Sequence, residues 1–420
     1  MNPGLLSFDD ARAALLAQAA PLHDIETVDT AEATGRVLAA DIRATLDVPP
    51  RDNTQMDGYA VRRADLERAT STAPVRLHVA QRIPAGQVGR PLRPGEAARI
   101  FTGGLIPDGA DAVVMQEMAQ ADGDAVVFSH CPAPGEWIRR AGEDIRNGSV
   151  VLPAGTRLDP QAAGLAASVG LAELPVCRRV RVACFFTGNE LTMPGEPLKP
   201  GAIYNSNRYV LRGLLHALGC ELTDLGNVPD SLAATREALR RAARGNDLIV
   251  TSGGVSVGEE DHVKAAVEAE GEMRLWQIAM KPGKPLACGR VRRAADDGDA
   301  EPGTVGGAAH FIGLPGNPVS SFVTFVLLVR PFIQRLQGMK DVAARELPMR
   351  ADFDWRKPDR RREFLRARIN AQGGLDLFPN QSSGVLTSTV WGDGLIDNPP
   401  EMPIAAGDMV RFLPFAALVN

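Results

Sequence analysis

The strongest constraint on the fold is a regular alternation between about residues 179 and 338. Strand-like apolar runs are expected at Val180–Phe186, Glu221–Leu225, Asp247–Thr251, Met273–Ala279, Leu286–Arg290 and Ala309–Leu314. Stretches with helical spacing of apolar residues separate most of them, at Asn205–Leu218, Ser231–Arg244, Asp261–Glu270 and Val319–Gln337. This alternation predicts a mostly parallel sheet with right-handed crossovers, covered by helices on both faces.

Polar loops follow four of the predicted strands, at residues 187–191, 252–261, 281–285 and 315–318. Ligands of parallel sheets bind at the carboxyl ends of the strands, so these loops are expected to converge. Lys281 and Lys284 would bind anionic groups, whereas Glu190, Glu259 and Asp261 would hold a hard cation such as Mg²⁺. Each lysine alone is typical of a solvated turn. Their combination with acids and glycines indicates a binding edge.

The loop after the third strand is rich in glycine, and its free backbone N–H groups suit a bound anion. Gly253 and Gly258 have the spacing of a nucleotide P-loop, but Glu259 and Glu260 stand where lysine and a hydroxyl residue are required. This favours a phosphate loop with metal-binding acids over a P-loop nucleotidase. The open alternative is a tight connection whose glycines serve packing and whose acids cap the next helix.

The rest of the chain predicts a helical segment and two β-rich regions. Residues 7–19 have an amphipathic period with Ser7 as N-cap. Strands are expected at Val75–Ile83, Glu96–Phe101, Ala112–Gln116 and Ala125–Ser129, and again at Arg350–Asp354, Phe364–Ile369, Leu375–Phe378 and Met409–Leu413. Residues 150–175 read as helical. If they pack against the first helix, the first β-rich region is an insertion. The second would form a small barrel or sandwich.

Two further stretches carry open interpretations. Residues 292–307 are rich in alanine, aspartate and glycine and are expected to be a mobile excursion from a hairpin. Arg360, Arg361 and Arg362 form a basic run that reads equally as a solvated turn or as a grip on a phosphate.

Composition excludes several classes of protein. A chain of 420 residues is too long for one ordinary core. The formal net charge of −5 argues against nucleic acid as a partner. An apolar stretch of about 18 residues that would span a membrane is not expected, nor is a signal peptide, which favours the cytoplasm. The 5 cysteines lack CxxC spacing and are expected to be small buried hydrophobes.

Eight ordered motifs resemble one known family over essentially the whole chain. They are Met56–Ala60, Arg99–Pro107, Arg139–Ile145, Thr187–Leu191, Ile203–Arg208, Ser252–Asp261, Lys281–Pro285 and Leu314–Pro318. The chain resembles the molybdopterin molybdenumtransferases, the MoeA family, and is similar to the C-terminal part of gephyrin.

The resemblance implies a multidomain α/β plus β protein. Its expected parts are a helical domain of residues 1–47 with 146–177, an inserted β-rich domain of 48–145, an α/β molybdopterin-binding domain of 178–338 with a mostly parallel sheet, and a C-terminal β-barrel-like domain of 339–420. It also implies an elongated homodimer, whose cleft lies between the α/β domain of one subunit and the inserted domain of the other.

The implied reaction is insertion of molybdate into adenylylated molybdopterin with release of AMP and with Mg²⁺ as cofactor. The implied catalytic positions are Asp57, Thr102, Arg139, Asp144, Glu190, Asp230, Asp261 and Lys281, of which Glu190 and Asp261 would bind the metal. The implied cofactor-binding positions are Ser252, Gly253, Gly254, Ser256, Gly258, Lys284, Pro315, Gly316, Asn317, Pro318 and Ser383. Further implied partners are the molybdopterin adenylyltransferase and acceptor molybdoenzymes.

The chain departs from the family pattern at four positions, which are Asn189, Gln277, Ser382 and Asp393. Asn189 replaces a usual aspartate, and it motivates an alternative in which the chain carries molybdopterin or the finished cofactor without turnover. A scaffold role, which gephyrin also has, predicts an appended domain or a long linker, and neither is expected here. A nucleotide-dependent kinase is disfavoured by the residues after Gly258.

Overall fold

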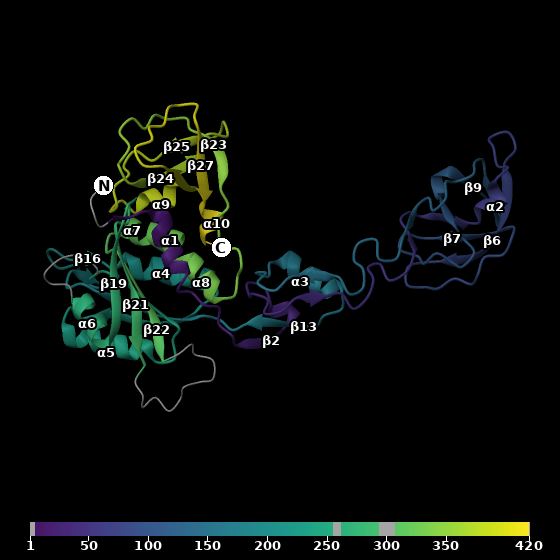
Figure 1. The fold of residues 1–420 in the computed structure, drawn as a ribbon. Coiled ribbons are helices and arrows are strands. Elements are labelled where there is room, and N and C mark those ends of the chain that lie inside the picture. The colour runs from purple at the N-terminus through teal and green to yellow at the C-terminus, as the bar shows by residue number, and fades with distance from the viewer. Residues whose placement is uncertain (1–4, 255–261, 294–306, 420) are drawn as a thin grey trace. The chain divides into compact units, whose positions relative to one another are not determined.

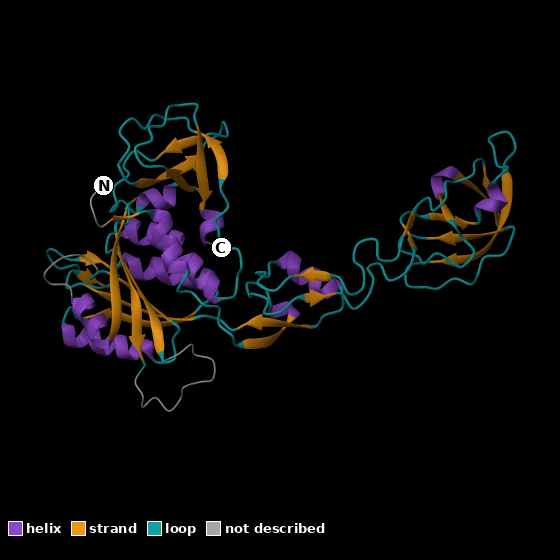
Figure 2. Ribbon diagram, in the orientation of Figure 1, coloured by secondary structure: helices purple, strands orange, loops and turns teal. Residues whose placement is uncertain are grey.

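The computed structural model describes residues 5–254, 262–293 and 307–419. The chain divides into two compact units. The larger unit comprises Met1–Ala40, Ala154–Asp159 and Leu174–Asn420, and the smaller comprises Asp41–Pro153 and Pro160–Glu173. Figures 1 and 2 show the helices and strands of each unit. The four-part division expected from the resemblance stays a prediction.

A mixed sheet forms the centre of the larger unit. Among the described residues its strands follow the order β1 (Leu5–Leu6), β19 (Gly271–Ile278), β21 (Pro285–Arg292), β22 (Ala308–Leu314), β18 (Leu248–Ser252), β14 (Arg181–Thr187) and β17 (Glu221–Val228). The last four run parallel, which confirms the predicted parallel core. β21 pairs antiparallel with both β19 and β22. Only residues 279–284 separate β19 from β21, and so short a connection cannot carry a parallel crossover.

Helices cover both faces of this sheet (Figure 1). On one face α5 (Leu232–Ala243) and α6 (His262–Glu270) bury Leu239 and Ala266 against Phe185 and Phe311. On the other face lie α1 (Phe8–Leu16), α4 (Ser206–Ala217), α7 (Pro318–Thr324) and α8 (Arg330–Leu336). The predicted N-cap of α1 is confirmed, since the Ser7 Oγ accepts a hydrogen bond from the Asp10 N–H at 3.1 Å.

The segment Pro318–Leu336 was not singled out from the sequence as long and apolar. Within the described part of the chain, this helical segment alone has the length and composition of a membrane span. However, 89% of its most apolar 18 residues are buried inside the protein. It is therefore a core helix. Between α7 and α8 it contains a π-helical turn, Phe325–Val329. Pro331 explains the irregularity, because it has no N–H to donate to the carbonyl one turn earlier.

The C-terminal β region forms a second sheet of the larger unit. Its strands are β20 (Met280–Lys281), β24 (Arg362–Ile369), β26 (Gly394–Asn398), β27 (Met409–Pro414) and β23 (Leu347–Arg350), with β25 (Leu375–Leu377) beside β24 and the short helices α9 (Thr387–Trp391) and α10 (Phe415–Val419). The predicted small β domain is confirmed. β20 was not predicted, and it pairs Lys281 with Glu363 across the two regions.

The smaller unit is β-rich, as predicted. Its main sheet has the order β8 (Ala112–Met115), β5 (Gly58–Val61), β7 (Glu96–Ile100), β6 (Val75–Ile83), β10 (Ala125–Phe128) and β9 (Ala119–Asp122). Two small ladders join β4 (Asn53–Thr54) to β11 (Ile138–Arg139) and β3 (Ile42–Arg43) to β12 (Val150–Leu152). The helix expected within 150–175 is α3 (Pro160–Ser168), which belongs to this unit, whereas α1 belongs to the larger one. Most of the excursion 292–307 lies outside the described residues.

Candidate active site

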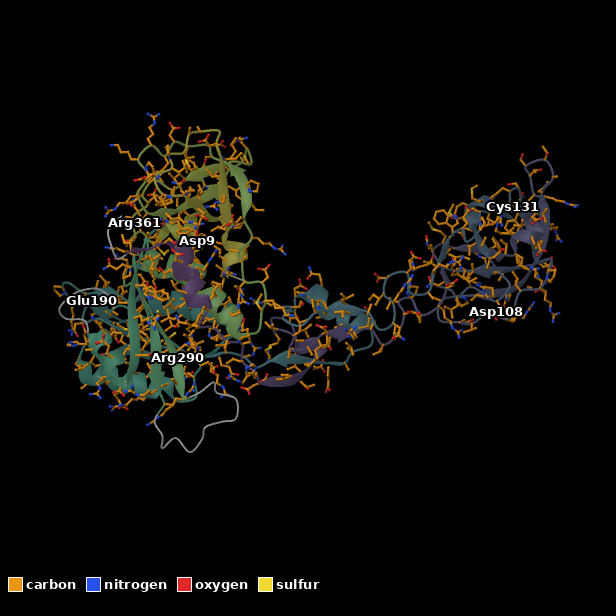
Figure 3. All side chains as sticks on the ribbon, viewed as in Figure 1. Asp9, Asp108, Cys131, Glu190, Arg290 and Arg361 are labelled. Carbon is orange, nitrogen blue, oxygen red and sulfur yellow. The ribbon has the colours of Figure 1, made fainter. Side chains whose placement is uncertain are left out.

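A cleft of about 720 Å³ lies at the strand ends of the larger unit. The loops after β14, β18 and β22 and the loop 281–285 all line it, which confirms that the polar loops converge. Figure 3 labels Glu190 and Arg361, two of its lining residues. The expected site residues that line this cleft are Glu190, Asp230, Ser252, Gly253, Gly254, Lys281, Lys284, Pro315, Gly316, Asn317, Pro318 and Ser383.

Other expected site residues lie elsewhere. Ser256, Gly258 and Asp261 lie outside the described residues, and so does Glu259. Asp57, Thr102, Arg139 and Asp144 belong to the smaller unit. Their roles therefore remain predictions.

The start of the glycine-rich loop requires glycine for steric reasons. Gly253 and Gly254 have φ values of +97° and +64°. A Cβ on Gly253 would lie 2.7 Å from the Thr187 carbonyl oxygen, and one on Gly254 would lie 2.5 Å from a Val263 methyl group. Packing therefore requires glycine at both positions, while the acids of the packing interpretation lie outside the described residues. Since both also line the cleft, the phosphate interpretation remains a prediction beside it.

Two carboxylates line the cleft from loops after β14 and β17. Asp230 accepts a hydrogen bond from the Thr187 Oγ1 at 3.1 Å. Glu190 folds over Gly188, where an added Cβ would lie 2.6 Å from a carboxylate oxygen. The ladder of β15 (Leu191–Thr192) with β16 (Ile203–Tyr204) fixes this loop. The described residues contain no group of three His, Cys, Asp or Glu side chains able to hold a metal.

The cations of the cleft have different environments. Lys281 Nζ lies 3.2 Å from a Glu363 oxygen and 3.4 Å from an Asp359 oxygen. Lys284 is exposed, and within the described part of the chain it forms no ion pair. Arg361 lines the cleft and pairs with Asp359 at 2.9 Å. Its hydrogen bonds hold the pKa of the Asp359 carboxyl far below its usual range.

The arginine run is divided by its contacts. Arg361 faces the cleft, which favours a grip on an anion for that residue. Arg362 instead pairs with Asp397 and lies over the Phe8 ring, its carbon Cζ 4.8 Å from the centroid. Arg360 is exposed, so of the three arginines it is the one that fits the interpretation as a solvated turn.

Asn207 is a cleft residue absent from the predicted set. Its Nδ2 donates hydrogen bonds to the Ser252 Oγ and to the Gly316 carbonyl oxygen, each at 2.8 Å. It therefore connects the loops after β18 and β22. The signal was present in the motif Ile203–Arg208. Gln381 also lines the cleft without having been singled out from the sequence, together with Arg361 of the basic run and Ser382 of the four departures.

In the smaller unit, Asp57 and Thr102 are directly bonded. Asp57 Oδ1 accepts hydrogen bonds from the Thr102 N–H at 2.8 Å and from its Oγ1 at 2.7 Å. These bonds, with a smaller effect of Arg99, lower the pKa of Asp57. Arg139 lies in β11, which pairs with β4. β4 in turn contacts the loop that contains Thr102, because the Thr54 N–H donates a hydrogen bond to the Gly104 carbonyl oxygen. Asp144 is exposed.

The four residues that depart from the family pattern differ in exposure and in whether they line the cleft. Asn189 is exposed beside Glu190, and Ser382 lines the cleft. Gln277 lies in β19 opposite Pro285. Asp393 accepts a hydrogen bond from the Ile369 N–H at 2.9 Å, so its carboxylate has a local structural role.

The five cysteines, all within described segments, are free. Cys184, Cys220 and Cys288 are buried, as expected, and burial raises the pKa of the Cys220 and Cys288 thiols to about 12. Cys131 and Cys177 are partly exposed, which corrects the expectation for those two.

The fold and the cleft define the class of this protein as a multidomain α/β protein with a polar ligand cleft at the ends of parallel strands. Three family models match consecutive parts of it. Residues 6–170 match the MoeA N-terminal region (domain I and II), residues 183–335 a probable molybdopterin binding domain, and residues 348–415 the MoeA C-terminal region (domain IV).

Full-length relatives agree with these matches. The molybdopterin molybdenumtransferase of Haemophilus influenzae is 39% identical over 99% of this chain and 100% of its own length. Molybdopterin molybdenumtransferase 2 of Mycobacterium tuberculosis is 36% identical over 92% and 94%. The crystal structure of a molybdopterin biosynthesis MoeA protein from Pyrococcus horikoshii superimposes with a TM-score of 0.83 at 29% identity, covering 98% of this chain and 100% of that one. This chain belongs to the MoeA family of molybdopterin molybdenumtransferases.

Proposed function

We propose that this protein acts in molybdenum cofactor biosynthesis by inserting molybdenum from molybdate into adenylylated molybdopterin, with release of AMP. The observation that carries the proposal is the convergence of Lys281, Lys284, Glu190 and Asp230 on one cleft of about 720 Å³. A volume of that order suits a ligand of nucleotide size. Relatives with the transferase name over their full length support the catalytic function over a carrier role.

The residues of the cleft suggest a division of roles. Lys281 and Lys284, with Arg361, supply positive charge for the phosphates, and the backbone at Gly253 and Gly254 allows a close approach. Asn207 keeps the loops on both sides of the ligand in register. Ser383 offers a hydroxyl from the C-terminal β domain. The dithiolene of the ligand supplies the sulfur that binds molybdenum, so no cysteine of this chain is needed.

Mg²⁺ is proposed as the metal cofactor. Glu190 and Asp230 offer carboxylate oxygens of the type that Mg²⁺ prefers, so the donor chemistry of the cleft fits this ion. Glu190 and Asp230 would hold it together with Asp261, and the ion would then supply charge neutralisation near the phosphoanhydride.

We further propose that the protein is a cytoplasmic homodimer whose smaller unit completes the cleft of the partner subunit. Asp57, Thr102, Arg139 and Asp144 would then face the substrate from the other chain. The free cysteines are consistent with a reducing compartment. The molybdopterin adenylyltransferase and acceptor molybdoenzymes are the proposed neighbours in the pathway.

The roles of the carboxylates are tested by AMP release from adenylylated molybdopterin with molybdate and Mg²⁺. Glu190→Gln and Asp230→Asn are each expected to lower kcat by about 100-fold, because each removes a carboxylate that would hold Mg²⁺ near the phosphoanhydride. Glu196→Gln is the matched control, since Glu196 is exposed in the same segment and does not line the cleft. Full activity of both cleft variants would contradict the assignment.

A further inference from the structure

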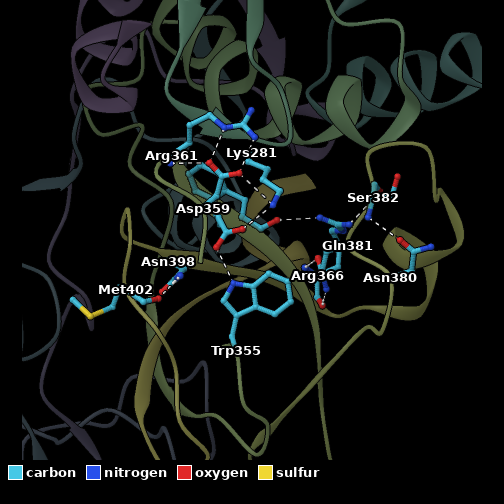
Figure 4. Close-up of polar contacts among 12 residues, drawn as sticks. Lys281, Trp355, Asp359, Arg361, Arg366, Asn380, Gln381, Ser382, Asn398 and Met402 are labelled. Atoms are coloured by element: carbon cyan, nitrogen blue, oxygen red, sulfur yellow. Dashed lines mark hydrogen bonds and ion pairs between the residues drawn. The ribbon is translucent and has the colours of Figure 1, made fainter. Parts of the chain in front are cut away.

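The ammonium of Lys281 is held by the C-terminal β domain. Strand β20 places Lys281 directly beside Glu363 of β24, although the two residues are 82 positions apart in the sequence. The Lys281 Nζ lies 3.2 Å from the Glu363 Oε1. Figure 4 shows Lys281 close to Asp359 and Arg361. The cleft residue Lys281 is thus held by β24, which belongs to the C-terminal sheet and not to the main sheet.

The surroundings of Glu363 hold its carboxylate in one position beside the Lys281 ammonium. Its side chain is completely buried, with 0% exposure, whereas that of Lys281 is 37% exposed toward the cleft. The second oxygen of Glu363 accepts a hydrogen bond from the Trp355 indole N–H at 2.8 Å. Trp355 is itself fixed by backbone hydrogen bonds with Ile404. Both oxygens of the carboxylate therefore have a defined partner and a defined direction.

Asp359 differs from Glu363 in its partners. It accepts hydrogen bonds from the Arg361 backbone N–H, from Nε at 3.0 Å and from Nη2 at 2.9 Å. Its contact with Lys281 is longer, at 3.4 Å. Asp359 thus serves mainly Arg361. Among the described residues, Lys281 is the cation in ion-pair contact with Glu363.

A lysine has a flexible stem, and its ammonium adopts many positions unless something holds it. A buried carboxylate is strongly unfavourable without a cation, so Glu363 draws the ammonium to one place. The ammonium remains partly exposed, so it also stays available to an anion. A charge fixed in advance stabilises developing negative charge more than a mobile one.

We propose that Glu363, held by the Trp355 indole, is a positioning residue that fixes the Lys281 ammonium for contact with a phosphate or oxyanion of the substrate. This proposal rests on the proposed function of the cleft. Neither Glu363 nor Trp355 lines the cleft, so both act through Lys281.

The kinetic test uses Glu363→Gln, which keeps the size of the side chain and removes its charge. kcat for AMP release is expected to fall about tenfold or more, because the ammonium is no longer aligned. KM is expected to stay the same or fall, since Lys281 is no longer partly neutralised. Trp355→Phe, which removes the indole N–H, should change kcat in the same direction by less. Wild-type kcat in Glu363→Gln would overturn the proposal.

A double-mutant cycle separates positioning from general stability. Lys281→Ala alone and Lys281→Ala with Glu363→Gln are expected to have the same kcat, because without the ammonium Glu363 has nothing to position. Asp397→Asn is the matched control, since Asp397 is a buried carboxylate of the same domain that pairs with Arg362 and Arg411. It should lower Tm while leaving kcat and KM unchanged. Additive losses in the cycle would contradict the proposal.

A spectroscopic measurement does not depend on turnover. The protein has 4 tryptophans, so the indole N–H region of a ¹⁵N spectrum should contain four signals, and Trp355→Phe assigns one of them. Lys281→Ala is expected to shift the Trp355 signal through Glu363. If the signal shifts but wild-type protein releases no AMP, the proposed function fails and the anchor stands. If AMP is released and neither the signal nor kcat responds, the anchor fails.

Discussion

Asn207 shows how a single amide can join two parts of a binding site. Its Nδ2 contacts the Ser252 hydroxyl and the Gly316 carbonyl, and Ser252 in turn donates to the Pro315 carbonyl at 3.0 Å. The loops after β18 and β22 are thus connected through one side chain. The position of this side chain follows from the first turn of α4, where Asn205 caps the helix.

Asn207→Ala is expected to raise KM for adenylylated molybdopterin by about tenfold and to leave the fold intact. The two lost hydrogen bonds are each worth roughly 1 kcal/mol, enough to loosen the loops without unfolding the protein. Steady-state kinetics and Tm measure the two effects. Asn227→Ala is a useful comparison, because Asn227 bonds to Asn205 and does not line the cleft. An unchanged KM in Asn207→Ala would show that the loops do not need this bridge.

Residues were predictable where their role is local. Ser7 as an N-cap depends only on the residues that follow it, and the structure confirms it. Asn207 was not identified as a cleft residue, and Arg361 was left between a solvated turn and a phosphate contact, because their places in the cleft depend on elements distant in sequence. A packing role for the glycines of this loop was one of two open interpretations, but the contact that requires glycine at position 253 was not predictable, since it comes from the Thr187 carbonyl on a neighbouring strand.

At the scale of an element, β22 contains a partly buried histidine that links stability to pH. His310 is partly buried in the sheet, and its ring centroid lies 5.1 Å from that of Phe332. Burial, followed by the nearby Arg290, lowers its pKa from 6.5 to about 4. The folded protein therefore keeps His310 neutral where the unfolded chain would protonate it.

The free energy of unfolding of the larger unit should fall as pH drops from about 6.5 to about 4. The unfolded state binds the additional proton in that window, so stability present above pH 6.5 is lost, on the order of 3 kcal/mol from this residue. His310→Gln should flatten this part of the pH profile. Urea unfolding followed by tryptophan fluorescence measures it, since Trp276, Trp355 and Trp391 lie in the larger unit. Identical slopes in both proteins would refute the role of His310.

Elements with strong periodicity were predictable, and short ones were not. The parallel strands β14, β17, β18 and β22 match the predicted runs because each is followed by or follows a long amphipathic helix. β1 and β20 are two residues long and have no periodic signal. Their pairing is decided by the tertiary fold. The π-helical turn within Pro318–Leu336 also escaped prediction, because it depends on how the chain relaxes around Pro331.

At the scale of the whole molecule, the proposed shared site of a homodimer has a direct test. Asp57→Asn and Glu190→Gln each inactivate a different half of the proposed composite site. Mixing the two variants after dissociation should restore about a quarter of wild-type activity, because half of the dimers are mixed and each has one intact site. Recovery is measured as AMP release. Absence of recovery in a mixture proven to contain mixed dimers would place both residues in sites of one chain.

The domain types were predictable from the sequence, since the change from alternating to β-rich patterns near residue 340 is local information. The composition of the cleft was only partly predictable. Its four strand-end loops follow from the topology of a parallel sheet, whereas the Lys281 to Glu363 contact requires a strand pairing over 82 positions. No local pattern indicates such a pairing.

The most direct test of the account is molybdate-dependent AMP release by the purified wild-type protein with adenylylated molybdopterin and Mg²⁺, measured together with the molybdenum retained on the product. The account predicts that AMP forms only when molybdate is present, with about one molybdenum incorporated for each AMP released. Tight binding of adenylylated molybdopterin without AMP release would contradict it and would make this chain a carrier of the cofactor.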